Sequence, residues 1–320
     1  MITSERLAGP RSLALFAPAA FVLIWSTGFL VARYGMPYAP PFKFLTLRYA
    51  LSAACFLIWA LSFNVRFPTE RMQFVHLSVV GIMMQAVYLG GVWAAIKGGM
   101  GAGLTSLIVG LQPVFTAAWM SSRGNRMTSV QWFGIGLGFA GLLLVVSQKL
   151  HVGEVRLSTV IFAVTALTSM TIGTLYQKRF IKQCDVRTAS IIQMAAAFVV
   201  TLPLCLLETE GFSWYLRGHP NYELLGSMAW SVFGMTLGGS SLLYMLIHRG
   251  VATSVTSLFY LVPPTTAVFA WLLFSEPISP TTVIGLVITA AGVSLVTRPR
   301  FSQMKRKSNA TIMRNSDTDV

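Results

Sequence analysis

Ten long apolar runs make up most of this chain and constrain its fold more than any other feature. Each is about 20 residues long, the length a helix needs to cross a hydrocarbon core of about 30 Å. Their approximate centres are Leu23, Ser52, Met84, Leu111, Phe139, Ala166, Ala196, Phe233, Pro263 and Ile288. Because 54% of the residues are hydrophobic and only 11% are charged, we expect an all-α integral membrane protein with ten transmembrane helices.

The second half of the chain repeats the first. The segment Gly103 to Phe115 (GLTSLIVGLQPVF) returns 151 residues later as Ser254 to Thr266 (SVTSLFYLVPPTT), with Thr-Ser-Leu and a proline in register. Upstream the offset is 145 residues, which places Gln193 at the position of Arg48. Each copy holds five spans, and because five is odd the second copy must enter the membrane from the opposite side. The sequence therefore predicts two inverted five-helix repeats, an arrangement typical of transporters.

Basic residues are unevenly divided between the two sides of this arrangement. If the N-terminus is cytoplasmic, 17 of the 24 Lys and Arg residues fall in cytoplasmic segments and six in outside loops, with Arg48 inside a span. Cytoplasmic loops carry an excess of Lys and Arg, so we predict that both termini are cytoplasmic. The net charge of +14 follows from this bias and indicates no nucleic-acid partner. Residues 299–320 form a basic tail that we expect to be disordered, with contact to anionic membrane lipid as the alternative.

Prolines interrupt the fourth and ninth runs at matching positions. Pro113, Pro263 and Pro264 each lack a backbone donor and clash with the carbonyl four residues earlier. In lipid a freed carbonyl is tolerated only against protein or a water-filled cavity. We therefore predict that both helices bend in mid-membrane beside a cavity and act as gating points. A kink whose carbonyls are bonded by neighbouring Ser and Thr side chains is the alternative.

Arg48 lies inside the second run, where an unpaired charge costs several kcal/mol. No Asp or Glu lies at comparable depth in any of the ten runs. Its partners are therefore expected to be carbonyls, water or an anionic group such as a substrate carboxylate. The alternative is that its side chain reaches the outer interface, because Arg48 is only about two turns from the start of its helix.

Polar and aromatic residues recur on single helix faces at spacings of three and four. We predict that they line a modestly polar pocket, with hydrogen bonding between helices as the alternative role. The predicted substrate-binding residues are Trp25, Arg48, Gln85, Tyr88, Trp93, Gln112, Tyr176, Tyr244 and Tyr260. Thr236 and Ser240 follow the same spacing. Gly134 and Gly138 indicate close packing, so we expect the fifth and tenth runs to form a scaffold or a homodimer face.

Motifs of enzymes and metalloproteins are missing from the sequence. It has no Walker loop, no His-Cys cluster with metal-ligand spacing and no Ser-His-Asp set. We therefore expect no catalysis, no metal and no cofactor. A membrane-embedded lipid-modifying enzyme is a weaker alternative, because it would need paired carboxylates that the runs do not contain.

Several motifs resemble those of the EamA family in the drug/metabolite transporter superfamily. They are WSTGF at Trp25–Phe29, Arg48 before an Ala-rich run, and SEPIS at Ser275–Ser279 followed by GLVITAAGVSL at Gly285–Leu295. The resemblance covers Leu13 to Arg298 and implies EamA-like repeats at residues 13–147 and 157–298. It also implies a central cavity lined chiefly by helices 1, 3, 4, 6, 8 and 9. The family's glutamate after helix 9 matches Glu276, and its counterpart in the first copy is Asn125.

Together these features predict a secondary active transporter of the cytoplasmic membrane. We expect it to bind a small-molecule substrate and to export small metabolites, amino acids or related compounds, by alternating access. An importer or exchanger of sugars, nucleobases, phosphorylated compounds or other small metabolites is the alternative.

A reporter that is active only in the periplasm, fused after Val320, is expected to give no signal, because an even number of spans returns the chain to its starting side. Reporter activity in whole cells is the measurement, and the same reporter inserted in the predicted outside loop after Leu216 is the positive control. A strong signal after Val320 would contradict the predicted topology.

Overall fold

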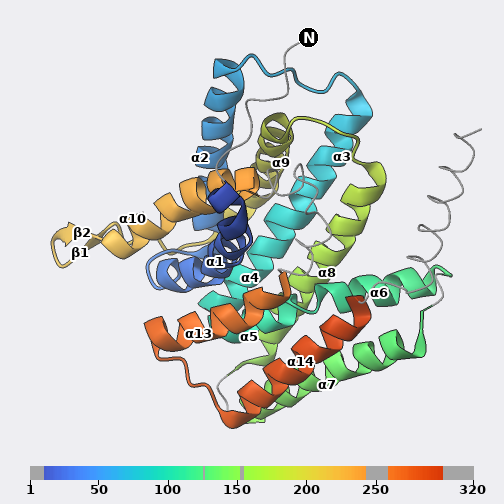
Figure 1. The fold of residues 1–320 in the computed structure, drawn as a ribbon. Helices are drawn as coiled ribbons and strands as arrows, with labels where there is room; N and C mark the ends of the chain where they lie inside the picture. The colour runs from blue at the N-terminus through green and yellow to red at the C-terminus, as the bar shows by residue number, and fades with distance from the viewer. Residues whose placement is uncertain (1–10, 125–126, 152–154, 243–258, 298–320) are drawn as a thin grey trace, which may run out of the picture.

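The structure is a computed structural model that describes residues 11–124, 127–151, 155–242 and 259–297 (Figure 1). The described residues form helices and one short antiparallel hairpin, β1 (Tyr215–Leu216) with β2 (His219–Pro220). The predicted first repeat contains α1 (Arg11–Gly35), α2 (Pro41–Ser62), α3 (Arg71–Gly81), the π-helix η1 (Ile82–Val87), α4 (Tyr88–Lys97), α5 (Ala102–Val109), α6 (Gln112–Ser122) and α7 (Ser129–His151). The second holds α8 (Leu157–Phe180), α9 (Val186–Leu207), α10 (Tyr222–Ala229), the π-helix η2 (Trp230–Gly239), the 3-10 helix η3 (Phe259–Leu261), α13 (Val262–Phe274) and α14 (Pro280–Thr297).

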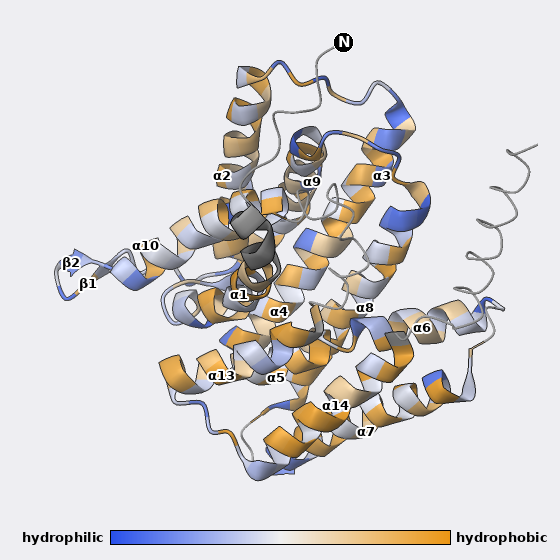
Figure 2. Cartoon of the chain, in the orientation of Figure 1, coloured by the Kyte–Doolittle hydropathy of each residue, from blue (hydrophilic) through white to orange (hydrophobic). Residues whose placement is uncertain are grey.

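Helices of membrane-spanning length dominate the described residues. Six segments are long and apolar enough to cross a membrane, namely Pro41–Ser62, Arg71–Lys97, Ala102–Ser122, Ser129–His151, Leu157–Phe180 and Val186–Leu207. Shorter apolar helices cover Ala19–Gly35, Val262–Phe274 and Pro280–Val296. Hydrophobic residues cover most helices, and hydrophilic ones gather at loops and helix ends (Figure 2). An all-helical membrane protein is confirmed, whereas ten crossings and cytoplasmic termini stay predictions.

Two long helix pairs hold the halves of the chain together. α2 packs along α9, and α7 packs along α14 at the bottom of Figure 1. In the predicted repeats, α2 and α9 are both second helices, and α7 and α14 are both fifth helices. A twofold axis between the two copies would pair the second helix of one copy with the second helix of the other, and the fifth helix with the fifth. The remaining helices, including α1, α4, α5, α8 and α13, pack between these pairs.

Glycines bring α7 and α14 into backbone contact. A Cβ atom on Gly141 would lie 2.5 Å from Thr289 Oγ1 and 2.7 Å from the Gly285 carbonyl oxygen. A Cβ atom on Gly134 would lie 2.8 Å from the Gly292 carbonyl oxygen. The predicted small-residue face is therefore covered by α14 of the same chain. The homodimer stays a prediction, and it would have to use another face of these helices.

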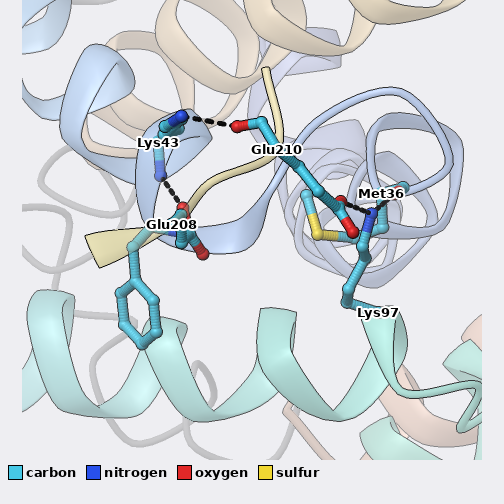
Figure 3. Close-up of polar contacts among 6 residues, drawn as sticks. Met36, Lys43, Lys97, Glu208 and Glu210 are labelled. Carbon is cyan, nitrogen blue, oxygen red and sulfur yellow. Dashed lines mark hydrogen bonds and ion pairs between the residues drawn. The ribbon is translucent and has the colours of Figure 1, made fainter. Parts of the chain in front are cut away.

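A loop after α9 ties helix ends together where α1 ends and α2 begins (Figure 3). The Glu208 carboxylate accepts hydrogen bonds of 3.0 and 2.8 Å from two backbone N–H groups in the first turn of α2, which have no partner within the helix. Glu210 accepts a hydrogen bond from Lys43 Nζ through its carbonyl oxygen, and its carboxylate lies 3.0 Å from Lys97 Nζ. Lys97 also donates to the Met36 carbonyl at 3.1 Å. The loop therefore joins the start of α2, the end of α4 and the α1–α2 turn.

Replacing Gly141 by Ala is expected to lower the free energy of unfolding by about 1–3 kcal/mol, because the added methyl group overlaps α14. Gly136 on the same helix has no neighbour within 4 Å of a built Cβ atom, so Gly136→Ala is the matched control and should be neutral or slightly stabilising. Thermal unfolding of the purified variants in detergent measures both effects. Equal unfolding midpoints would contradict the close contact between α7 and α14.

Candidate functional site

A cavity of about 140 Å³ lies among the helices, lined from α1, α2, η1, α4, α8, α9 and η2 and by Ser240 just after η2. A smaller cavity of about 30 Å³ shares four of its lining residues and extends to the junctions of α5 with α6 and of η3 with α13. The shared residues are Trp25, Phe29, Tyr88 and Met170. The two cavities therefore form one site between the helices.

Most of the predicted site residues come together around these cavities. Trp25, Arg48, Gln85, Tyr88 and Trp93 line the larger cavity. The smaller one is lined by Gln112, Pro113 and Pro263, together with Trp25 and Tyr88. The structure thus brings residues from distant parts of the chain to one place, and their role in binding stays a prediction.

The remaining predicted residues lie elsewhere or outside the described residues. Tyr176 lines neither cavity, because it lies beside α3, where its hydroxyl is 2.8 Å from His76 Nδ1 and its ring packs on Phe180. Pro264 borders a separate cavity of about 20 Å³ next to α14. Tyr244 is outside the described residues, as is the side chain of Tyr260.

Arg48 places a positive charge in the wall of the larger cavity. Its side chain is buried, at 6% exposure, so it does not reach the outer interface. Its Nη2 donates to Thr236 Oγ1 at 3.1 Å, and its Nε is buried without a hydrogen-bond partner. Among the described residues no acidic side chain forms an ion pair with it. A buried charge with one neutral partner is costly, so the site is suited to an anion.

Two π-helical segments place polar groups beside Arg48. Met84 and Gln85 in η1 line the larger cavity, as do Met235 and Thr236 in η2. A π-helix shifts backbone bonding by one residue and is frequent at functional sites. Tyr49 Oη donates to the Gln85 carbonyl at 2.7 Å, and Thr236 Oγ1 donates to the carbonyl five residues earlier at 2.8 Å.

Sequence reasoning missed these π-helices, although the predicted repeat relates the cavity-lining residues that they hold. The offset of 151 residues maps Met84 onto Met235 and Gln85 onto Thr236. Both pairs line the same cavity. The other two lining methionines, Met170 and Met194, carry no such signal, because apolar residues are common throughout the spans.

The fourth span is broken beside the smaller cavity. α5 ends at Val109 and α6 begins at Gln112, which puts Pro113 in the first turn of α6. Pro263 lies likewise in the first turn of α13. Backbone N–H groups in a first turn have no partner within the helix, so a proline is tolerated there. A Cβ atom on Gly110 would lie 2.6 Å from Pro263 Cγ, so the two junctions touch.

Apolar side chains close the larger cavity toward the start of α2. The rings of Phe44 and Trp93 lie 4.4 Å apart and are almost fully buried. Phe44 is one turn from Arg48 along α2. Met36 and Ile96 are also buried at this end. The loop that contains Glu208 and Glu210 is bonded to the helix ends on the same side (Figure 3). Side chains thus separate the cavity from this end of the molecule.

Glu276 bonds the start of α5 and does not line these cavities. Its Oε1 accepts a hydrogen bond from the Ala102 backbone N–H at 2.9 Å, and its Oε2 accepts one from Gly103 at 3.4 Å. Arg33 Nε lies 3.8 Å from Glu276 Oε1. A carboxylate at a helix N-terminus is favourable. Glu276 and Arg33 also border a pocket of about 300 Å³ at the helix ends, which is larger but contains no predicted site residue. The counterpart, Asn125, lies outside the described residues.

An all-helical membrane protein with a cavity of polar and apolar side chains amid broken helices has the features of a secondary transporter. The model of the EamA-like transporter family matches residues 12–147 and 157–298. This chain belongs to that family and is a multi-pass protein of the cytoplasmic membrane.

Similar proteins include two bacterial relatives and one solved structure. The chain is 24% identical to "Uncharacterized inner membrane transporter YedA" of Escherichia coli, over 90% of each chain. It is 24% identical to "Probable amino-acid metabolite efflux pump" of Salmonella typhimurium, over 87% of this chain and 92% of the relative. A crystal structure of another protein aligns with 90% of this chain and 98% of its own, at 17% identity and a TM-score of 0.60, which shows a shared fold.

Replacing Arg48 by Met is expected to leave the free energy of unfolding unchanged or to raise it by up to about 4 kcal/mol, because it removes an unpaired buried charge. Thr236→Val is the contrasting variant, because it leaves the charge without its partner and should lower stability by about 1–3 kcal/mol. Thermal unfolding without ligand measures both. A large loss of stability in Arg48→Met would show that Arg48 holds the helices together.

Proposed function

We propose that this transporter exports small amphipathic metabolites that carry a carboxylate, amino acids or related compounds, by alternating access. The observation that carries the proposal is Arg48, a buried cation in the cavity wall with one neutral side-chain partner and a free Nε. A carboxylate has the charge and the acceptor oxygens that a guanidinium group binds best. Arg48 therefore receives the acidic group of the substrate.

The rest of the cavity suits the other parts of such a molecule. Trp25, Tyr88 and Trp93 provide aromatic surface for an apolar side chain. Gln85 provides a carbonyl oxygen and an amide that can bond a further polar group. The name of the Salmonella relative, an amino-acid metabolite efflux pump, supports the same class of substrate.

Alternating access requires one end of the cavity to close while the other opens. The layer of Phe44 and Trp93 closes the end near the start of α2, which the predicted topology places outside. The junctions at Pro113 and Pro263 touch each other and border the site. Because these junctions interrupt helical hydrogen bonding, they can flex more easily than continuous helices. Transport then proceeds as the two copies rock around the cavity.

Inside-out membrane vesicles that contain this protein are expected to take up labelled amino acids in a saturable manner. Uptake should collapse with an uncoupler, because a secondary carrier draws its energy from an ion gradient. The measurement is the initial uptake rate against concentration, with vesicles that lack the protein as the baseline. No saturable uptake of any compound in an amino-acid panel would contradict the proposal.

Two variants test whether this uptake depends on residues that line the cavity. Gln85→Ala is expected to change the order of preference within the panel several-fold while the amount of protein in the membrane stays normal. Gln177→Ala is the matched control, because Gln177 is exposed near the end of α8 and lines none of the cavities described above. Loss of the Gln85→Ala protein from the membrane would instead assign Gln85 a packing role.

A further inference from the structure

We infer that the cavity selects carboxylates of net negative charge over zwitterionic amino acids of the same size. The inference rests on the proposed function and narrows its substrate class. Arg48 is the one charged residue among the described residues that line the two cavities. A ligand with one negative charge therefore neutralises the site, whereas a zwitterion brings a second positive charge into it.

None of the acidic side chains that the structure describes lines either cavity, so none is in place to hold an ammonium group there. The acids that the structure describes are all in loops or at helix ends, namely Glu70, Asp185, Glu208, Glu210, Glu223 and Glu276. The sequence has no Asp or Glu between Glu223 and Glu276, so the stretch 243–258 supplies none. The neutral groups at the site, such as the side chains of Gln85 and Tyr88, bond a hydroxyl as well as an ammonium.

The lack of an acidic side chain beside Arg48 matters because of the geometry of an amino acid. Its carboxylate and its ammonium are attached to one carbon atom, so a carboxylate bound to Arg48 holds the ammonium close to the same guanidinium. Like charges at such short distance repel strongly in a site shielded from water. The aromatic rings can attract a cation, but they are weaker partners than a carboxylate. A 2-hydroxy acid has the same shape without this repulsion.

The apolar lining indicates the size and shape of the rest of the ligand. The larger cavity has about 140 Å³, close to the volume of a cavity of about 150 Å³ that takes up benzene. Four methionines, Met84, Met170, Met194 and Met235, line it, and methionine side chains adapt to ligands of different shape. An aromatic ring therefore fits the larger cavity, with the carboxylate at Arg48 in its wall and the adjoining cavity of about 30 Å³ as further space.

Three ligands that share a benzyl group test the inference on the purified full-length protein. At pH 7, 3-phenyllactate carries one negative charge, phenylalanine is a zwitterion, and phenylalanine amide is a cation without a carboxylate. Isothermal titration in detergent is expected to give a Kd for 3-phenyllactate at least tenfold lower than for phenylalanine. Phenylalanine amide should bind too weakly to measure.

An Arg48 variant tests the cause of this preference. Arg48→Gln should weaken 3-phenyllactate binding at least tenfold and remove most of its advantage over phenylalanine. Arg123→Gln is the matched control, because Arg123 is exposed at the end of α6, with its guanidinium 5.3 Å from the Trp119 ring. It should leave all three affinities unchanged. The comparison of ligands on the unaltered protein stands even if Arg48→Gln does not fold.

The outcomes separate this inference from the proposed function. Equal or tighter binding of phenylalanine would overturn the preference for net-anionic carboxylates and leave amino-acid export standing. Absence of 3-phenyllactate binding, together with saturable amino-acid uptake in vesicles, would also overturn the inference alone. Absence of binding by all three ligands, together with no uptake, would overturn both.

Discussion

The structure depends on the requirement that each backbone polar group inside a membrane be bonded within the protein. Regular helices meet it along most of the described chain. Departures from α-helical bonding include the π-helices η1 and η2, the junction of α5 with α6 and the 3-10 helix η3. Residues from all of them line the two central cavities. The irregular backbone in each of these segments therefore borders a cavity.

Arg48 shows how this scaffold holds a charge without neutralising it. The helices around it give one hydroxyl acceptor at Thr236 and leave Nε without a partner. Stability alone would favour an apolar residue at this position, because an unpaired buried charge lowers the stability of the fold. Placing such a group in a cavity wall is the pattern of a binding site, where the ligand supplies the missing charge.

Three acidic side chains form bonds at the ends of the helices. Glu208 and Glu276 accept backbone hydrogen bonds in the first turns of α2 and α5, and Glu210 pairs with Lys97. These carboxylates lie in loops at the helix ends, where little desolvation is required of them. Arg48 is thus separated from the acidic side chains, and it is the one charged side chain among the described residues that line the two cavities.

The sequence by itself determined the all-helical membrane class and the family, and most of the residues that it singled out lie around the two cavities. It did so because lipid permits few backbone structures and because charge, proline and aromatic residues stand out in apolar runs. Only the tertiary structure placed Tyr176 beside His76 and outside the cavity, showed that Pro113 and Pro263 begin new helices, and revealed the π-helices. These features depend on which face of each helix meets its neighbours. Spacing along one helix fixes which residues share a face, but contact between helices decides what that face touches.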